Sequence, residues 1–473
     1  MRAGRVNKGP GGATHRPMMR AAKTQRCAAN ALPLPFCLLL ALAVICTPIA
    51  HAAPTVREFT LGLSGQGRPI QALRVGDGPR KLVVVGDTHG GPEANTYQLT
   101  IQLTDYFRAH LDAVPPGVRL YLIPSLNPDG LAIGTRFDGA GVDLNRNMNT
   151  DLDACAENDW SPTVQGARGI VSDTGGPYPD SQTESRLIRA FLLDAAGAIF
   201  IHSNAGMVFP AFCAHAPSIS MAQAYAAGAG YEYSRYWPSY NITGGMSDWA
   251  ESLGVAAITP ELVTGDRSEY EQNLAGLQAV LANAAAILPL PEDGAVDGVR
   301  VPAAIYRYWR ALGDRERFGP PLAPARADSA GVTQVFANAV IQLRGDLADT
   351  PYYVQPAPLG RVAAESLAFG GAGALAPGDP AGAPVFFAET GHGIKGAFLD
   401  FWQRGGGADV FGLPISEEFT GHAADGRARA LQYFERTVLA YGPEDGGVRL
   451  EPLGARQQML AALILPLAPQ TVR

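Results

Sequence analysis

Residues 80–93 read RKLVVVGDTHGGPE, an apolar run that passes directly into a loop of glycine and polar residues. Further short apolar runs predict strands at 118–123, 198–201 and 256–259, and stretches of helical composition lie at 95–114, 181–194, 218–227 and 270–287. Apolar strands that alternate with helices predict an α/β fold with a mainly parallel, mixed sheet covered on both faces. In such sheets the functional residues lie beyond the carboxyl ends of the strands.

The first 52 residues differ in composition from the rest of the chain. They carry seven Lys and Arg and no acidic residue, followed by an apolar run from Leu34 to Ile49 and then by Ala50-His51-Ala52. This order predicts a secretory signal that is cleaved near Ala53, so that the mature protein is exported. An uncleaved membrane anchor is the less favoured alternative, because the apolar run is shorter than the ~20 residues needed to cross a bilayer. No later segment is long and apolar enough to span a membrane.

Charge and cysteine usage limit the classes of function. Without the leader the chain has 30 Lys and Arg against 44 Asp and Glu, a net charge of −14. This balance disfavours a nucleic-acid partner held by a general positive field. Only Cys155 and Cys213 lie beyond the leader. In an exported protein they either form one disulfide or stay as two free buried thiols, and the sequence leaves both alternatives open.

The last third of the chain contains two similar aromatic-rich segments. In each, a Trp is followed nine residues later by a Phe-Gly pair: Trp309 with Phe318, and Trp402 with Phe411. They resemble the Trp/Phe-Gly-Pro repeats of exported bacterial enzymes, including the LGFP type, which makes the cell wall a candidate partner. Core filling explains these aromatic positions better than a ligand-binding strip. We expect a signal (1–52), a catalytic domain (53–292), a linker (293–302), a first repeat module (303–361), a Gly/Ala/Pro-rich linker (362–384), a second repeat module (385–456) and a tail (457–473).

Two histidines and a carboxylate follow predicted strands in an arrangement that can hold a metal. His89 and Glu93 lie in the loop after the 82–85 strand, and His202 comes directly after the 198–201 strand. Neutral imidazoles and a carboxylate are typical zinc ligands. Taken alone, the pair is better explained without a metal, with His89 as an ordinary loop histidine and Glu93 as an acidic residue in the first turn of the next helix.

Other polar residues suit the binding and hydrolysis of a substrate with a carboxylate. Arg136, Asn145 and Arg146 lie in one loop region, and guanidinium groups bind carboxylates in a bidentate manner or polarise a carbonyl. Arg146 alone would pass as a structural ion-pair partner. Glu261 ends the 256–259 strand, where a carboxylate can act as a general base.

In combination these motifs resemble the zinc metallocarboxypeptidases, also called funnelins, over about Glu58 to Glu292. The segments SGQGRPI at 64–70 and VDLNRN at 142–147 are most similar to the branch that acts on murein peptides. The resemblance implies one Zn²⁺ per chain and a complete set of roles. These are zinc ligands at His89, Glu93 and His202, a general base at Glu261, a carbonyl-polarising group at Arg136, a carboxylate clamp of Asn145, Arg146 and Tyr240, and a specificity position at Ser247.

The chain departs from the family pattern at two places. The usual first motif is His-x-x-Glu, whereas His89 and Glu93 are one residue further apart. Gly90-Gly91 gives the backbone freedom to absorb the extra residue, so we keep Glu93 as ligand, with Asp87 in reserve. Met148 stands where an aromatic residue usually follows Asn-Arg-Asn, and both choices serve apolar packing.

We therefore expect an exported zinc carboxypeptidase that removes the last residue of a peptide or murein peptide. One rival is a murein peptide amidase or an N-acyl amino acid deacylase that uses the same zinc site. Another is a non-catalytic cell-wall binding protein that has lost its metal. We also expect the catalytic domain to have its own core, so that a chain ending near Glu292 folds.

Overall fold

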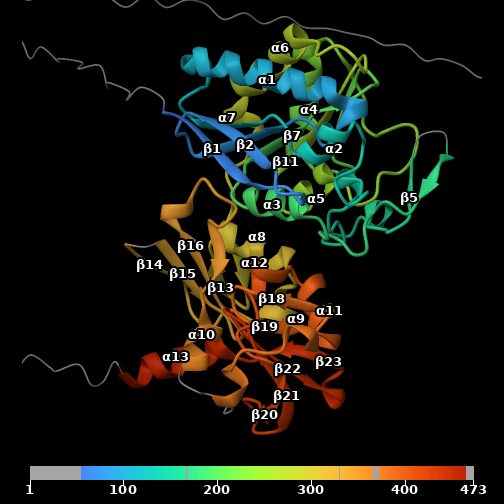
Figure 1. Ribbon diagram of the computed structural model, residues 1–473. Helices are drawn as coiled ribbons and strands as arrows, with labels where there is room; N and C mark the ends of the chain where they lie inside the picture. The colour runs from blue at the N-terminus through green and yellow to red at the C-terminus, as the bar shows by residue number, and fades with distance from the viewer. Residues whose placement is uncertain (1–54, 167–168, 330, 366–371, 465–473) are drawn as a thin grey trace, which may run out of the picture. The chain divides into compact units, whose positions relative to one another are not determined.

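The computed structural model describes residues 55–166, 169–329, 331–365 and 372–464 (Figure 1). The leader expected at 1–52 lies outside this part of the chain. Among the described residues, no helix combines the length and the apolar composition needed to cross a membrane.

A nine-stranded mixed sheet forms the centre of the N-terminal region. The strand order is β1-β2-β4-β3-β7-β11-β9-β10, and β8 pairs with the end of β11. The central strands β4, β3, β7 and β11 run parallel to one another, whereas the pairs β1–β2, β2–β4 and β9–β11 are antiparallel. This confirms the predicted α/β class. The strands are β1 (Val56–Leu63), β2 (Pro69–Val75), β3 (Arg80–Val85), β4 (Val118–Ile123), β7 (Gly197–Phe200), β8 (His202–Ser203), β9 (Met207–Pro210), β10 (Glu232–Tyr233) and β11 (Ala256–Leu262).

Helices cover both faces of this sheet because each central strand is apolar on both sides. On β3, Leu82 and Val84 face one buried cluster, and Val83 and Val85 face the other. The first cluster is covered by α1 (Ala94–Ala109), α4 (Ala216–Ala229), α6 (Tyr270–Ala282) and α7 (Ala284–Ile287). The second is covered by α3 (Thr183–Phe191) and α5 (Met246–Ser252), on the opposite side of the sheet in Figure 1.

The C-terminal region contains the same order of elements twice. The first set is a hairpin of β12 (Gly294–Val296) and β13 (Val299–Val301), α8 (Ala303–Ala311), α9 (Asp314–Phe318), a sheet of β14 (Arg326–Asp328), β15 (Gly331–Val335), β16 (Val340–Arg344) and β17 (Val354–Pro356), and α10 (Leu359–Glu365). The second is β18 (Val385–Phe387), β19 (His392–Ile394), α11 (Gly396–Arg404), α12 (Gly407–Phe411), β20 (Phe419–His422), β21 (Ala428–Tyr433), β22 (Val438–Gly442), β23 (Gly447–Leu450) and α13 (Leu453–Ile464).

Equivalent contacts recur in the two sets. The indole nitrogen of Trp309 donates to Gly319 O at 3.0 Å, and that of Trp402 donates to Gly412 O at 2.9 Å. The terminal helices are exchanged between the sets: the backbone N–H of Arg361 on α10 donates to Glu435 O, and that of Ala455 on α13 donates to Ala337 O. The two sets therefore pack against each other.

Three boundaries differ from the sequence-based expectation. Residues 293–302, expected as a linker, form the β12–β13 hairpin, because Val296 and Val301 are buried while the turn between them is polar. The described residues of the expected 362–384 linker include the end of α10 and two short 3₁₀ turns, at Ala372–Leu375 and Pro380–Gly382. The expected tail at 457–473 begins inside α13.

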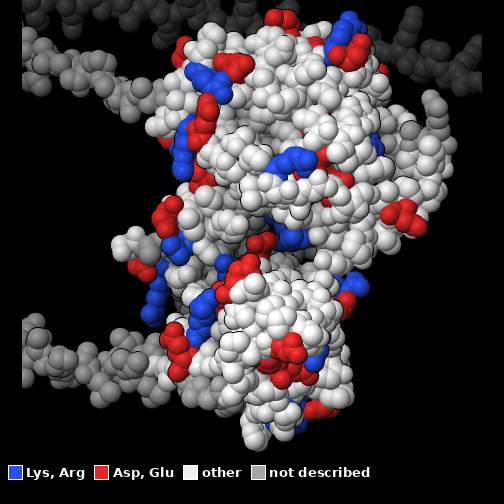
Figure 2. Space-filling model, viewed as in Figure 1, with Lys and Arg blue, Asp and Glu red and all other residues white. Residues whose placement is uncertain are grey.

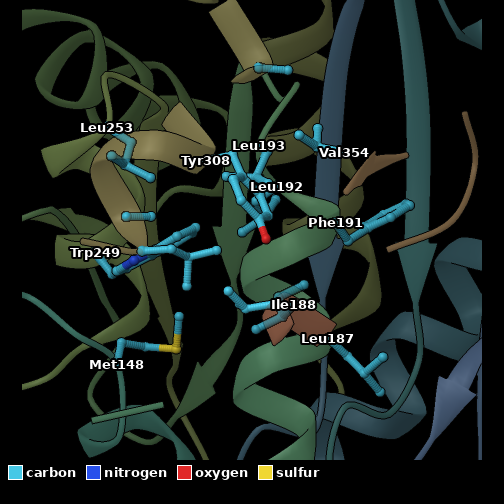
Figure 3. Close-up of a cluster of buried hydrophobic side chains, with 14 of the residues drawn as sticks. Met148, Leu187, Ile188, Phe191, Leu192, Leu193, Trp249, Leu253, Tyr308 and Val354 are labelled. Carbon is cyan, nitrogen blue, oxygen red and sulfur yellow. The ribbon is translucent and has the colours of Figure 1, made fainter. Parts of the chain in front are cut away.

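The N-terminal region that holds the nine-stranded sheet and the C-terminal region share one hydrophobic cluster. Figure 3 shows Tyr308 and Val354 beside Leu192 and Leu193 at the end of α3. Polar contacts surround this junction: Asp349 accepts hydrogen bonds from the Tyr121 hydroxyl at 2.5 Å and from Arg74 and Arg57 at 2.8 and 3.0 Å. The cluster under α1, α4, α6 and α7 is formed by residues within 53–292 alone, whereas the cluster on the other face of the sheet includes residues of the C-terminal region.

Charged side chains are sparse and mixed in sign. Figure 2 shows acidic and basic groups interspersed on one face, with wide uncharged areas between them. Many are paired, as in the exposed contacts of Arg108 with Glu58 and Asp105. Exposed pairs of this kind contribute only about 0–1 kcal/mol each, so the fold is stabilised mainly by its apolar clusters.

Candidate active site

The predicted site residues meet at the carboxyl ends of the central strands. Glu261 is near the end of β11 and pairs in parallel register with His202 on β8. A cavity of about 280 Å³ at this edge is lined by eight of the nine predicted residues. They are His89, Glu93, Arg136, Asn145, Arg146, His202, Tyr240 and Glu261.

His89, Glu93 and His202 converge on one point. Glu93 Oε1 lies 2.8 Å from His89 Nδ1, Glu93 Oε2 lies 3.1 Å from His202 Nδ1, and the two Nδ1 atoms are 3.1 Å apart. All three side chains are buried, and their ligand atoms lie within 4.8 Å of one another. Two imidazole nitrogens and one carboxylate oxygen are the donor set of many catalytic zinc sites, so these residues fit Zn²⁺.

The extra residue in the first motif is accommodated by two glycines. A Cβ on Gly90 would lie 2.3 Å from the carbonyl carbon of Gly130, and one on Gly91 would lie 2.3 Å from that of Gly134. The loop therefore packs directly against the backbone of residues 130–134, and Glu93 still reaches His89 and His202. Asp87 is not one of the residues whose ligand atoms converge, and its carboxylate accepts a hydrogen bond from Ser125.

Asp143 is a contact residue that the sequence reasoning missed. Its carboxylate lies 2.8 Å from His89 Nε2 and accepts a hydrogen bond from Arg136 Nε at 2.9 Å. Carboxylates that bond the outer nitrogen of a metal-binding histidine fix its ring orientation and tautomer. The available signal was its place in the 142–147 segment, two residues before Asn145.

The pKa values of the two glutamates of the site, Glu93 and Glu261, are shifted in opposite directions. Burial disfavours ionised Glu93, but His89 and the hydrogen bond from His202 outweigh this effect and lower its pKa well below the usual range. Burial, and then the charge of Glu93, raise the pKa of Glu261 well above the usual range. Glu93 is thus suited to bind a cation, whereas Glu261 is suited to hold a proton.

Arg136 and Arg146 lie on the cavity wall in different settings. Arg136 Nη1 donates to Glu93 Oε1 at 2.9 Å, and its Nε donates to Asp143. Arg146 Nη1 donates to the backbone oxygen of Asn145 at 2.8 Å, and its guanidinium lies 5.7 Å from the centre of the Tyr240 ring. Within the described part of the chain, the buried Nε of Arg146 has no hydrogen-bond partner. Arg146 therefore keeps donor capacity for a ligand.

Ser247, the ninth predicted residue, lines an adjacent pocket. Thr259 Oγ1 lies 3.4 Å from Ser247 Oγ, and the neighbouring Asp248 accepts a hydrogen bond from the Phe212 backbone N–H at 2.7 Å. The walls of the pocket are mostly aromatic or apolar, from Phe209, Pro210, Phe212, Tyr236, Trp237 and Ile242. Cys213, which follows Phe212, forms a disulfide with Cys155, with their Cα atoms 6.2 Å apart.

The sequence profile of the zinc carboxypeptidase family matches residues 46–295, which is just over half of the chain. The chain therefore belongs to the zinc carboxypeptidase family, a family of zinc-dependent peptide hydrolases. The match covers the whole nine-stranded sheet and all nine predicted site residues.

Individual relatives match over shorter stretches. Bacteriocin BCN5 of Clostridium perfringens is 34% identical over 146 residues, which are 29% of this chain and 15% of that protein. Carboxypeptidase SOL1 of Arabidopsis thaliana is 28% identical over 104 residues, 20% of this chain and 21% of that protein. The chain thus spans less than a quarter of the length of either relative.

Solved structures similar to the chain include two at about 20% identity. Bovine thrombin-activatable fibrinolysis inhibitor, in complex with tick carboxypeptidase inhibitor, is 19% identical with a TM-score of 0.39 and covers 48% of this chain and 88% of its own. Murein-tripeptide amidase MpaA from Escherichia coli O157 is 20% identical with a TM-score of 0.37, and the match covers 49% of this chain and 98% of that protein.

Proposed function

We propose that the protein is an exported zinc-dependent carboxypeptidase that hydrolyses the peptide bond next to a free C-terminal carboxylate. The observation that carries the proposal is the convergence in one cavity of a three-residue zinc-binding set, a buried carboxyl group and two guanidinium groups. His89, Glu93 and His202 would hold the metal. When bound, Zn²⁺ would supply Lewis-acid chemistry, which lowers the pKa of water and polarises a carbonyl.

Glu261 is the group that moves the proton. Its Oε2 is buried and has no hydrogen-bond partner among the described residues, so it is available to accept a proton from the attacking water. Its raised pKa favours holding that proton until it is passed to the leaving amine. Arg136 is fixed by Glu93 and Asp143, and the remaining N–H groups of its guanidinium can stabilise the oxyanion that forms at the scissile carbonyl.

Asn145, Arg146 and Tyr240 would select a substrate that ends next to the cleaved bond. The free Nε of Arg146 and the amide of Asn145 provide donors for a carboxylate, and Tyr240 lies beside the guanidinium. A substrate anchored in this way places its last peptide bond at Glu261. The pocket beside Ser247, whose walls include four aromatic rings from Phe209, Phe212, Tyr236 and Trp237, would take the side chain of the departing residue, and these walls favour an apolar side chain.

The test compares a blocked dipeptide ending in Phe with its C-terminal amide and with a murein tripeptide. We expect efficient hydrolysis of the free acid and at least about 100-fold lower kcat/KM for the amide, because the amide cannot pair with Arg146. Equal cleavage of acid and amide would refute the carboxylate clamp. Cleavage of the murein peptide alone would instead establish the amidase alternative, and cleavage of none would favour the non-catalytic one.

Export and cell-wall contact belong to the same proposal but rest on the sequence. The leader supports secretion, and the aromatic-rich repeats support a surface partner. N-terminal sequencing of the protein recovered outside the cytoplasm should begin near Ala53. Sedimentation of the full chain with purified cell wall should bring it into the pellet. An intact leader would refute the proposed export with cleavage, and absence from the pellet would refute the proposed cell-wall contact.

A further inference from the structure

Two buried asparagines lie among the loops that carry the site, and neither belongs to the predicted site set. Asn95 is 3% exposed and Asn127 is fully buried. Each uses its side-chain amide to join backbone segments that come from different strands. Loops beyond strand ends lack the ladder hydrogen bonds of the sheet, so their spacing must be fixed by other contacts.

Asn95 joins three of these segments. It follows Glu93 by two residues, its Nδ2 donates to Thr264 O at 2.7 Å and to Arg267 O at 3.0 Å, and its Oδ1 accepts from Ser203 Oγ at 3.0 Å. Ser203 is next to His202, and residues 264–267 form the loop that follows Glu261. One amide therefore links the segments of two zinc-binding residues with that of the general base.

Asn127 joins the segment before His89 to the backbone of Arg136. Its Nδ2 lies 3.3 Å from both Thr88 O and Arg136 O, while its Oδ1 accepts from Gly130 N at 2.8 Å as the N-cap of α2 (Pro128–Ile133). Thr88 precedes His89. The amide thus fixes the distance between the first zinc-binding loop and the backbone of Arg136.

We propose that Asn95 and Asn127 are positioning residues, which hold the zinc-binding residues, Arg136 and Glu261 at their working separations. The inference rests on the proposed function. A short neutral amide supplies two donors and an acceptor without adding charge beside Glu93 or Glu261. Changes to such supporting contacts typically cost about 10–100-fold in metal affinity or activity.

The experiment uses the full zinc-loaded chain and separates two readouts. Asn95→Leu keeps the branched arrangement of the side-chain heavy atoms and removes all three hydrogen bonds, so zinc affinity, measured by competition with a chromophoric chelator, should fall at least about 10-fold. Asn127→Ser keeps an N-cap oxygen for Gly130 but loses both amide contacts, so kcat should fall at least about 10-fold while KM and zinc affinity change little.

Asn273→Leu is the matched control. Asn273 is also fully buried, donates to Tyr231 and Glu269, and accepts from Tyr225, but it contacts none of the proposed site residues. It should lower the thermal stability as much as Asn95→Leu and leave zinc affinity and kcat within about 3-fold, because its hydrogen bonds join α6 to Tyr225 on α4, to Tyr231 and to Glu269 and not to a proposed site residue.

Three outcomes decide the inference. Unchanged zinc affinity in Asn95→Leu, together with unchanged kcat in Asn127→Ser, would overturn it, as would an equal loss in the control. If Asn95→Leu does not fold, Ser203→Ala removes only one contact and should still weaken zinc binding about 3-fold; no change there would count against Asn95. A wild-type chain that binds zinc but cleaves no peptide refutes the proposed function, and the zinc titration then still tests Asn95.

Discussion

Glu261 and His202 are paired residues in the parallel register of β11 and β8. This pairing places a carboxyl group beside an imidazole of the zinc-binding set, although Glu261 is not one of the three residues whose ligand atoms converge. Glu261 is 9% exposed, and burial raises its pKa. The sheet itself thus keeps the proposed base and the proposed metal position at a fixed separation.

The longer first motif makes the choice between Glu93 and Asp87 testable. We expect Glu93→Gln to weaken zinc binding by at least about 100-fold, because it removes a charged ligand that contacts both histidines. Asp87→Asn should change zinc affinity by less than about 10-fold, since Asp87 bonds Ser125 and burial raises its pKa to about 7. The measurement is a chelator competition titration. The reverse ranking would move the ligand role to Asp87.

Ser247 should set the preference for the departing residue. Ser247 carries no charge, and the adjacent Asp248, which also lines the pocket, accepts a hydrogen bond from the Phe212 backbone N–H, so we expect no strong wild-type preference for Lys or Arg. Ser247→Asp should shift relative kcat/KM towards Lys and Arg by about 10–100-fold, measured on matched peptides ending in Phe, Leu, Lys and Arg. A wild-type preference for Lys or Arg above about 100-fold would show that another acidic residue reaches the pocket.

Asp248 should make stability depend on pH. Burial raises its pKa from 3.8 to about 6, so the folded state binds the proton more tightly than the unfolded state. Its contribution is therefore fully present below about pH 4 and is lost as the pH rises through about 6. The difference in unfolding free energy between Asp248→Asn and wild type should therefore favour the variant by up to about 3 kcal/mol more at pH 8 than at pH 4. Urea unfolding at both pH values measures this, and a pH-independent difference would contradict the shift.

Asp349 should be a main contact between the C-terminal region and the sheet. Asp349→Ala leaves the Tyr121 hydroxyl and Arg74 without this acceptor, so we expect a loss of about 3 kcal/mol in unfolding free energy. Asp346→Ala, in the same segment, removes only an exposed pair with Arg344 and should change little. A chain ending at Glu292 should melt at a lower temperature and bind a hydrophobic dye, because it exposes the shared cluster.

Equal stability of the two aspartate variants would contradict this role of Asp349. A truncated chain as stable as the full one would show that residues 53–292 have a sufficient core of their own. Both measurements can be made by circular dichroism during thermal unfolding, with zinc content checked in parallel so that metal loss is not mistaken for a loss of packing.

The parts of the fold with a strong local signal could be predicted from sequence. The strands β3, β4, β7 and β11 are continuous apolar runs, and their polar ends carry the site. By contrast, β1 and β2 were missed. β1 is largely exposed and includes polar residues, and β2 is a short segment whose place in the sheet is set by its antiparallel pairing with β1 and β4. The shared cluster was missed because it joins residues as far apart as Leu192 and Val354, and the Pro- and Gly-containing segment at 289–302 has the composition of a linker.

The supporting residues of the site were less predictable than its proposed ligands. Two histidines and a glutamate that follow strand ends are typical metal ligands, so the residue types of His89, Glu93 and His202 indicate metal binding. Asn95 and Asn127 have the composition of ordinary helix-start or turn residues, and Asp143 could pair with any nearby base. Only the distances of 2.7–3.3 Å from these side chains to their partners distinguish support of the site from a local turn.

The most direct test measures zinc content and hydrolysis of a blocked dipeptide on the same preparations of three proteins. Wild type should hold one zinc per chain and be active, His202→Ala should lose both zinc and activity, and Glu261→Gln should keep zinc while kcat falls by at least about 100-fold. Full activity in wild-type protein shown to be free of metal would contradict the central claim, and loss of zinc in Glu261→Gln would make Glu261 a ligand instead of the base.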